Sequence, residues 1–461
     1  SNPMQRFFKA LGTACFLFMP VAAQSQSDWS DYFYRSMTAD KGTPVTLPAD
    51  ANKKISEDKI GISRDFMWKA WLNAVRRRPV PHLIPAAALS DSSRGELAIP
   101  DSLEPAAVMP YYYGLKGDLA ATGNTSVPTY LYLHGSGPKA QEWAASLSWA
   151  KIFADAPSRY FIPQIPNEAP YYRWWQRSKQ WAWTWLWQQL TLTPGFDPDR
   201  FYIFGISEGG YGSQRLASYY ADYLAAAGPM AGGEPLINAP AENLSNIGFS
   251  LLTGAKDYAF CRDRYTRITG ETLDSLAQSG SGIYAHRVQL IPEMGHGIDY
   301  RPTTPWLSQF RRNPWPRRFV WEDFAMDGRH RSGFYNLRSD RQLPDSIRLR
   351  YDVDMCTPNI VKITVNRVEY IPTEKDTTWN MTLRWNKQQT LENDYAFTVF
   401  LDEHLINMNE PVTVIVNGRR VFRGKLRPTL SAMGESIATY GDLRRIFTTK
   451  VSVSNNNRTT H

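Results

Sequence analysis

The sequence predicts an α/β protein with a mostly parallel central sheet, followed by a β-rich C-terminal domain. Between residues 97 and 310, short continuous apolar runs alternate with amphipathic segments, as in a parallel sheet with helices on both faces. Within residues 311–461, several runs instead alternate apolar and polar residues, which indicates half-buried strands. A chain of 461 residues is long enough for two or three domains.

The N-terminus predicts export. Residues 1–23 contain a short cloning remnant before Met4, two basic residues, an apolar run from Leu11 to Val21, and small residues that suit a cleavage site. This pattern is typical of a signal peptide, so we expect a periplasmic or extracellular protein. No later stretch reaches the roughly 18 apolar residues of a membrane helix, and we expect no membrane span in the mature chain.

Residues 24–96 predict an N-terminal extension that packs on the main domain, with one helix at 63–78 because apolar residues recur there at helical spacing. Without the signal peptide the net charge is about +6. The basic residues are scattered and no nucleic-acid motif accompanies them, so we expect no nucleic-acid partner. Cys261 and Cys356 are either a disulfide or two free thiols, and no cysteine spacing suits a metal.

The expected strands can be read from the apolar runs. In the α/β domain they are VPTYLYL, SRYFIP, RFYIFGI, LAAAGPM, IGFSLLT and HRVQLI. In the β-rich domain, Asn417-Gly418 separates VTVIV from RRVFRG, which is a strong hairpin signal. One helix at residues 430–447 is expected to close that domain.

The run RFYIFGISEGGYGSQRLA predicts a strand, a sharp turn and a helix. Gly205, Ser207 and Gly209 form a Gly-x-Ser-x-Gly motif at the turn. In this context the motif forms a nucleophile elbow, because small residues permit a tight turn that raises the serine hydroxyl above the sheet. Ser207 is therefore the candidate nucleophile.

A serine nucleophile needs a base, and the base needs a carboxylate that orients it. In this kind of fold the chain order is serine, acid, histidine. His296, in MGHG after the last expected strand, is the candidate base, and Asp257, in TGAKD after the preceding strand, is the candidate acid. The less well placed alternatives are Asp263 and Asp299 as acids, and His286 and His330 as bases.

Backbone N–H groups must stabilise the oxyanion that forms during attack. We expect the amide of Glu208, which follows the nucleophile, and a second amide from LHGSG, with Ser136 first and Gly135 next. His134 in the same loop is expected to brace it rather than to act as a base.

The stretch YYRWWQRSKQWAWTWLWQQL is rich in tryptophan. Its later tryptophans lie at helical spacing and are expected to pack a helix on the sheet. Trp174 and Trp175 come earlier, in a loop between a strand and a helix, where loops border active sites. We expect them to bind substrate by stacking on a sugar or phenolic ring.

The motifs LYLHGSG, DPDRFYIFGISEGGYGSQRLA, AAAGPMAGG, TGAKD and MGHG resemble the α/β-hydrolase superfamily, in particular secreted esterases related to polyhydroxybutyrate depolymerases and to feruloyl and acetyl-xylan esterases. The resemblance covers residues 97–310. It implies a cofactor-free and metal-free ester hydrolase that forms an acyl-enzyme. Glu208 departs from the pattern, since these esterases often have an uncharged residue there.

We therefore expect an exported serine esterase that acts on a small-molecule ester or a carbohydrate ester, including esters of plant polysaccharides. Two other readings stay open. A serine peptidase of the prolyl-oligopeptidase type shares this set of residues, although residues 24–96 are too few for its β-propeller. A glycan-binding protein on a hydrolase scaffold would bind carbohydrate without turnover. The sequence leaves the acyl group, the alcohol and the oligomeric state open.

Overall fold

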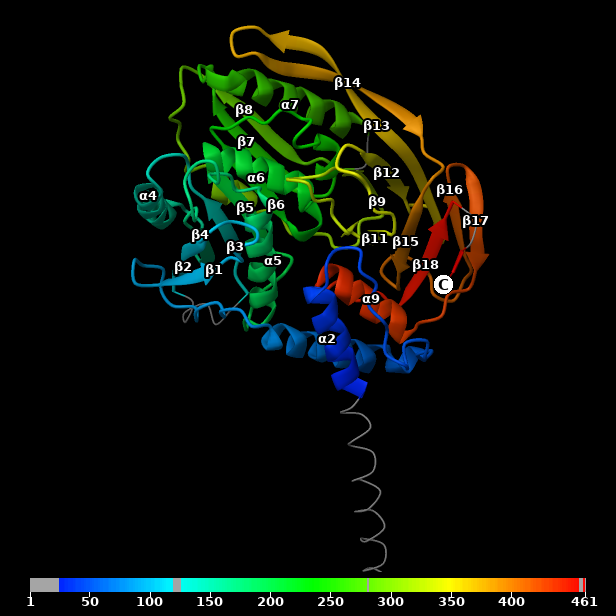
Figure 1. The fold of residues 1–461 in the computed structure, drawn as a ribbon. Coiled ribbons are helices and arrows are strands. Elements are labelled where there is room, and N and C mark those ends of the chain that lie inside the picture. Colours follow the sequence, from blue (N-terminus) through cyan, green and yellow to red (C-terminus); the bar gives the residue numbers. More distant parts are fainter. Residues whose placement is uncertain (1–24, 119–125, 280–281, 456–458, 461) are drawn as a thin grey trace, which may run out of the picture.

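The computed structural model describes residues 25–118, 126–279, 282–455 and 459–460 (Figure 1). The predicted signal peptide at residues 1–23 lies outside this part of the chain. Among the described helices, none combines the length and hydropathy that crossing a bilayer requires.

An eight-stranded sheet forms the first unit, in the order β1-β2-β4-β3-β5-β6-β7-β8. Its strands are β1 (Arg94–Ala98), β2 (Val108–Lys116), β3 (Thr129–Leu133), β4 (Ser158–Pro163), β5 (Phe201–Ile206), β6 (Ala226–Met230), β7 (Gly248–Gly254) and β8 (His286–Ile291). β2 is antiparallel to β1 and β4, and all pairings from β4 to β8 are parallel. Each apolar run that predicted a parallel strand contains one.

Helices cover both faces of this sheet, as the apolar runs predicted. The unit contains α4 (Lys139–Ile152), α5 (Arg177–Thr191), α6 (Glu208–Tyr219), α7 (Arg262–Gln278), α8 (Thr303–Leu307), and the short 3-10 helices η2 (Ala221–Tyr223), η3 (Ala241–Leu244) and η4 (Ala259–Cys261). Alternate residues of β3 point to opposite faces: Leu131 and Leu133 join the core under α5, α6 and α7, and Tyr130 and Tyr132 join the core under α4 and α8. On α5, Trp183 and Trp185 are buried, which confirms that the later tryptophans pack the helix.

The C-terminal region contains a five-stranded sheet in the order β10-β11-β15-β18-β19 and a six-stranded sheet in the order β17-β16-β13-β12-β9, with β14 paired to β13. The strands are β9 (Arg318–Asp323), β10 (Gly333–Phe334), β11 (Leu337–Ser339), β12 (Leu349–Asp354), β13 (Ile360–Asp376), β14 (Met381–Leu391), β15 (Ala396–Leu401), β16 (Val412–Val416), β17 (Arg419–Gly424), β18 (Thr449–Ser454) and β19 (Thr459–Thr460). Asn417 and Gly418 have φ of 51° and 77° and join β16 to β17, as the hairpin signal predicted. Cys261 is buried, Cys356 is exposed, and both are free thiols.

The predicted helix at 430–447 is shorter in the structure. α9 (Leu430–Tyr440) ends because Gly441 adopts the left-handed conformation, with φ of 56°, and its N–H bonds the carbonyl of Ile437. This is a common way to terminate a helix. The residues that follow return to an extended strand, β18.

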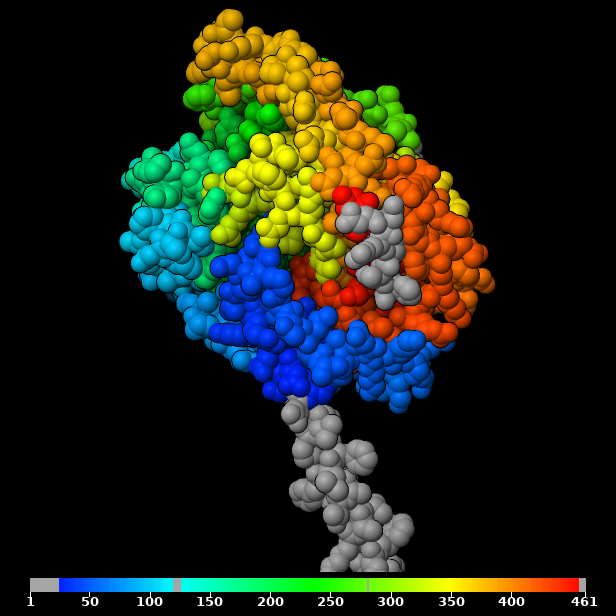
Figure 2. Space-filling model, turned by 45° about the vertical axis from the view of Figure 1, so that its right-hand side comes forward, coloured from blue at the N-terminus to red at the C-terminus, as the bar shows by residue number. Residues whose placement is uncertain are grey.

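The N-terminal extension packs only in part as predicted. Residues 25–38 are helical, followed by η1 (Glu57–Lys59) and α2 (Ile60–Arg77). Met67 and Trp71 of α2 share a core with Met433 and Ile437 of α9, and α2 also contacts α5. In Figure 2 the blue N-terminal residues lie beside the yellow chain that follows β9. The helices of the extension therefore pack mainly on the C-terminal region, which supplies the apolar face that α2 needs. Residues 78–93 pack on the sheet unit, as predicted, since Leu83 N–H bonds Gln189 of α5 and Leu89 N–H bonds the carbonyl of Leu115 on β2.

A buried ionic cluster joins the sheet unit to the C-terminal region. Arg445 donates from Nη1 to Asp222 (2.8 Å) and from Nε to Asp442 (2.7 Å). Arg312 also bonds Asp442, and Arg331 bonds both carboxylate oxygens of Asp222. Burial by itself raises the pKa of Asp442, but the charges of Arg312 and Arg445 outweigh it and hold that pKa well below its ordinary range. The two regions are thus connected by charges that water does not reach.

Arg445→Met is expected to lower the free energy of unfolding by about 3–5 kcal/mol, because it leaves the carboxylates of Asp222 and Asp442 buried without their shared partner. Denaturant titration followed by circular dichroism measures the change. Arg77→Met is the control, since Arg77 pairs with Asp31 on the surface where water solvates both groups. Equal effects of the two substitutions would contradict this role of Arg445.

Candidate active site

Ser207 lies at the turn between β5 and α6. Its φ of 58° and ψ of −113° are unusual for a residue with a side chain, a conformation that costs about 1–3 kcal/mol. The turn is fixed on both sides, because Ser207 N–H donates to the carbonyl of Met230 and its own carbonyl accepts from Tyr211 N–H, each at 2.9 Å. The hydroxyl therefore lies at the carboxyl end of the parallel strands.

Two glycines allow this turn to form. A Cβ on Gly209 would lie 1.9 Å from the carbonyl oxygen of Leu133 on β3, and a Cβ on Gly205 would lie 2.3 Å from the carbonyl oxygen of Gly209. No side chain fits at either position. The Gly-x-Ser-x-Gly pattern thus follows from the close approach of α6 to β3 and β5.

The structure brings Ser207, His296 and Asp257 together. Ser207 Oγ lies 2.9 Å from His296 Nε2, and His296 Nδ1 lies 2.8 Å from Asp257 Oδ2. His296 comes from the loop after β8, and Asp257 from the loop after β7. Parallel strands bring these loops to one edge of the sheet. This geometry lets Nε2 accept the serine proton while Nδ1 donates to the carboxylate.

Asp257 is buried and carries a second partner. Arg262 Nε donates to its Oδ1 at 2.8 Å. Burial alone raises the pKa of Asp257, but the hydrogen bonds from His296 and Arg262 outweigh burial and hold that pKa below its ordinary value. Asp257 is therefore ionised at neutral pH, as a group that orients an imidazole must be.

Three of the four alternative acids and bases have other side-chain partners, and the fourth, Asp263, is placed by its backbone. Asp299 bonds Arg301 (2.9 Å), and Asp263 lies in the first turn of α7, where its N–H bonds the carbonyl of Asp257. His286 and His330 bond Asp274 and Asp323. Of these candidates, Asp257 and His296 are the pair that reaches Ser207.

The loop between β3 and α4 borders Ser207. A Cβ on Gly135 would lie 3.4 Å from the Cβ of Ser207. His134 braces the loop, since its Nε2 accepts from Ile165 N–H (3.0 Å) and its Nδ1 donates to the carbonyl of Gly135 (2.8 Å). Burial lowers the pKa of His134 to about 4, so the ring is neutral. Gly135 thus lies beside Ser207, and Glu208 follows Ser207 at the start of α6. The assignment of the amides of Ser136, Gly135 and Glu208 to an oxyanion stays a prediction.

Glu208 is buried beside the nucleophile. Its carboxylate lies 3.5 Å from Arg173 Nη1. Burial raises the pKa of Glu208 to about 6, and the nearby charge of Arg173 opposes the rise only in part. The acid that departs from the esterase pattern is therefore largely uncharged in weakly acidic solution.

The prediction that Trp174 stacks on substrate is wrong. Its ring is fully buried, and its Nε1 donates to the carbonyl of His134 (2.9 Å). Trp174 packs against Gly212, where an added Cβ would lie only 2.6 Å from the Trp174 Cβ. The glycine at position 212 is the feature of the sequence that indicates this burial, because it leaves room for the Trp174 side chain. Trp175 is half-buried, and one face is covered by the guanidinium of Arg215, 4.0 Å from the ring centre.

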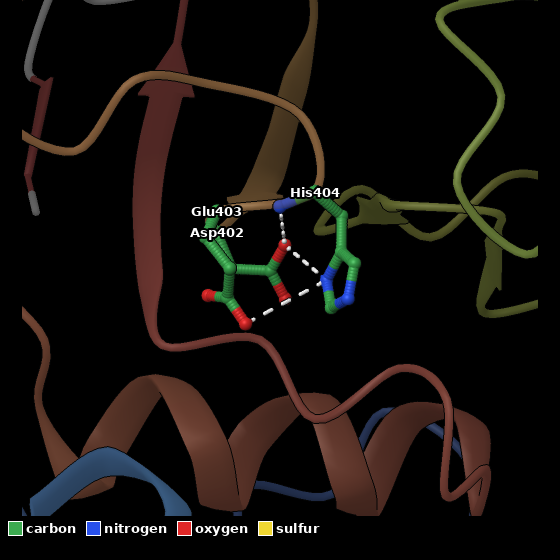
Figure 3. A group of neighbouring side chains, drawn as sticks. All are labelled: Asp402, Glu403 and His404. Carbon is green, nitrogen blue, oxygen red and sulfur yellow. Dashed lines mark hydrogen bonds and ion pairs between the residues drawn. The ribbon is translucent and has the colours of Figure 1, made fainter.

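Asp402, Glu403 and His404 form the group of potential metal ligands found within the described residues (Figure 3). The guanidinium of Arg64 donates to Asp402 (3.0 Å) and to Glu403. His404 stacks on Trp315 with ring centres 3.6 Å apart. Arg64 already supplies the cation that these carboxylates need, so the group attaches α2 to the C-terminal region.

The eight-stranded unit has the α/β-hydrolase fold. Its mostly parallel sheet, with a serine on a strained turn between strand and helix, is the arrangement that defines this assignment. No family model and no curated protein matches the chain.

Solved structures with similarity to the chain include a thermostable esterase (TM-score 0.36, 19% identity, 48% of this chain and 64% of that chain covered). A ferulic acid esterase aligns with a TM-score of 0.33 and 13% identity over 47% of this chain and 97% of that chain. The fluorophosphonate-binding serine hydrolase F of Staphylococcus aureus aligns with a TM-score of 0.33 and 14% identity over 46% and 93%. Since these scores are low, the fold assignment depends on the strand order and the turn.

Gly209→Ala is expected to lower the free energy of unfolding by about 3 kcal/mol, because the new methyl group would overlap the carbonyl of Leu133. Thermal unfolding followed by circular dichroism measures the loss. Gly297→Ala, beside His296, is the matched control, since a Cβ there would meet no atom within 4 Å. A Gly209→Ala protein as stable as the control would show that α6 and β3 are not in this close contact.

Glu208→Gln is expected to gain stability relative to the parent protein as the pH rises. Since the pKa of Glu208 is about 6 in the folded state and 4.5 ordinarily, its contribution to folding is complete below pH 4.5 and is lost as the pH rises through 6. Denaturant titrations at pH 4 and pH 8 should show a shift of roughly 2 kcal/mol in favour of the variant at the higher pH. The same difference between variant and parent at both pH values would contradict the buried state of this carboxyl group.

Proposed function

We propose that this chain is an exported serine hydrolase that cleaves carboxylic esters of carbohydrates. The hydrogen-bonded series from Ser207 through His296 to Asp257 carries the proposal, because it is the arrangement that makes a serine hydroxyl nucleophilic. The N-terminal pattern of basic, apolar and small residues supports export.

In the first half of the reaction, Ser207 Oγ attacks the ester carbonyl carbon while His296 Nε2 takes the hydroxyl proton. Asp257 stabilises the resulting imidazolium and keeps Nδ1 protonated. Backbone amides of Glu208 and of Ser136 or Gly135 stabilise the oxyanion, aided by the positive N-terminal end of α6. The tetrahedral intermediate then releases the alcohol, which receives the proton from Nε2, and an acyl-enzyme remains.

Water completes the cycle. The side chain of His296 is 45% exposed, so water can reach Nε2 once the alcohol has left. His296 takes a proton from water as the oxygen attacks the acyl carbon, and then returns that proton to Ser207 Oγ. The products are a carboxylic acid and the free enzyme.

Ser207→Ala is expected to lower kcat for p-nitrophenyl acetate by roughly five to six orders of magnitude, because the attacking oxygen is gone. Asp257→Asn is expected to lower it by roughly four orders, because the imidazole loses the partner that sets its tautomer. Spectrophotometric assays with ester and anilide substrates side by side measure both changes and separate an esterase from a peptidase.

Ser213→Ala is the control on the same helix, since that hydroxyl donates only to the carbonyl of Gly210 at 3.1 Å, and it should keep parental activity. A fluorophosphonate probe should label the parent protein and fail to label Ser207→Ala. A parent protein that hydrolyses no ester, or a Ser207→Ala protein that keeps parental turnover, would overturn the proposed function.

A further inference from the structure

Exposed apolar side chains gather on the loops that carry the candidate acid and base. Tyr258 and Phe260 follow Asp257 and are 61% and 52% exposed. Met294, in the loop before His296, is also exposed, and its carbonyl accepts from Lys256 N–H at 2.8 Å, so the two loops lie side by side. Large apolar side chains that remain in water beside a reactive group indicate a surface that contacts a ligand.

The C-terminal region contributes to this surface. Trp379, at the turn between β13 and β14, is 39% exposed and contacts Phe260, with ring centres 4.8 Å apart and planes tilted by 42°. Figure 1 shows the hairpin crossing from the six-stranded sheet to the side of α7. Two rings from segments that are distant in sequence therefore form one apolar patch, here called the Phe260–Trp379 pair.

The pair lies next to the candidate active site. The guanidinium of Arg262 lies over the ring of Phe260, 5.6 Å from its centre, and the same group donates to Asp257. Phe260 is the third residue after Asp257, a span of at most about 11 Å. A substrate extending from the ester at Ser207 toward α7 would therefore meet the pair.

The turn that carries Trp379 is held firmly. Asp376 accepts from Trp379 N–H (2.6 Å) and from Arg264 Nη2 of α7 (2.7 Å). The hydroxyl of Tyr265 donates to the carbonyl of Thr382 (2.6 Å). The turn that carries the ring is thus held beside α7 before any ligand arrives, which reduces the entropy that binding must overcome.

The surroundings of the pair suit a sugar chain. Charged groups lie beside it: Asp376, which pairs with Arg264 of α7, accepts from Trp379 N–H, and the guanidinium of Arg262 lies over Phe260. An acyl chain would require an enclosed apolar slot, whereas this patch is open and rimmed by hydrogen-bonding groups. A sugar ring has an apolar face that can stack on Phe260 and Trp379, and hydroxyl groups that can hydrogen-bond the charged side chains around them.

We propose that the Phe260–Trp379 pair binds the saccharide chain of a polymeric ester substrate and holds it beside Ser207. This inference rests on the proposed esterase function and adds to it a sugar-binding site that the C-terminal hairpin completes. It assigns to that region a direct part in substrate selection.

The test compares a long and a short ester. Trp379→Ala is expected to lower kcat/KM for acetylated xylo-oligosaccharides of about six sugars, mainly by raising KM. The decrease should be about tenfold larger than the decrease in kcat/KM for p-nitrophenyl acetate, because one stacking ring is lost. Trp379→Phe, which keeps a flat ring, should recover most of the loss. Trp149→Ala is the matched control, because Trp149 of α4 is comparably exposed, and it should leave the ratio of the two kcat/KM values unchanged.

A binding measurement separates this inference from the proposed function. Isothermal titration of acetylated xylohexaose into Ser207→Ala protein should show binding. The double variant, Ser207→Ala with Trp379→Ala, should bind the same oligosaccharide with an affinity about tenfold lower. The sugar-binding site would be overturned if the parent is an active esterase but does not favour the oligosaccharide ester, or if Trp379→Ala lowers both kcat/KM values equally. Either result would leave the proposed esterase function intact. Absence of any ester hydrolysis by the parent would instead overturn the proposed function, while the titration alone would decide the sugar-binding site.

Discussion

The close approach of α6 to β3 is the constraint on which the site depends. The carbonyl of Leu133 occupies the space that a side chain at position 209 would need, so the first turn of α6 can lie against the end of the neighbouring strand. That contact places the loop after β3 beside Ser207 at the start of α6. A strained serine conformation persists because backbone hydrogen bonds to Met230 and Tyr211 fix both of its neighbours.

A second constraint connects this site to the rest of the chain. Arg312, Arg331 and Arg445 face Asp199, Asp222 and Asp442 in a buried cluster, so each buried charge has an oppositely charged partner. Such clusters contribute little net stability over apolar packing, but a misaligned one would leave charges buried without partners. The cluster therefore favours one relative placement of the sheet unit and the C-terminal region, and that placement sets where the β13–β14 hairpin reaches α7.

Much of the sheet unit could be predicted from the sequence, because its signals are local. Continuous apolar runs identified the parallel strands, and the glycines around Ser207 identified the turn. The chain order of serine, acid and histidine then pointed to the residues that the structure brings within hydrogen-bonding distance. The strand and turn signals each lie within about a dozen neighbouring residues, where backbone preferences and side-chain periodicity dominate. The chain order spans a longer stretch, but it follows from the order of the strands in this kind of fold.

The remaining features depend on contacts between distant segments, which periodicity does not encode. The burial of Trp174 depends on the space left at Gly212, and the docking of α2 depends on the apolar face of α9. Each buried arginine also has a partner a hundred or more residues away, as Arg445 and Asp222 illustrate. A resemblance limited to residues 97–310 gave no information on any contact made by the C-terminal region.

The distribution of buried and exposed aromatic side chains supports a binding role for the β13–β14 hairpin. The chain has 16 tryptophans, and a high content alone would suggest ligands with flat rings. Trp29, Trp174, Trp183, Trp185 and Trp321 are among the largest fully buried side chains, so packing accounts for much of that content. An exposed tryptophan on a fixed turn, in contact with an exposed phenylalanine beside Asp257, has no comparable packing explanation. Since each ring comes from a different region, neither the sheet unit nor the C-terminal region presents this surface alone, and recognition of a long substrate becomes a property of the two regions together.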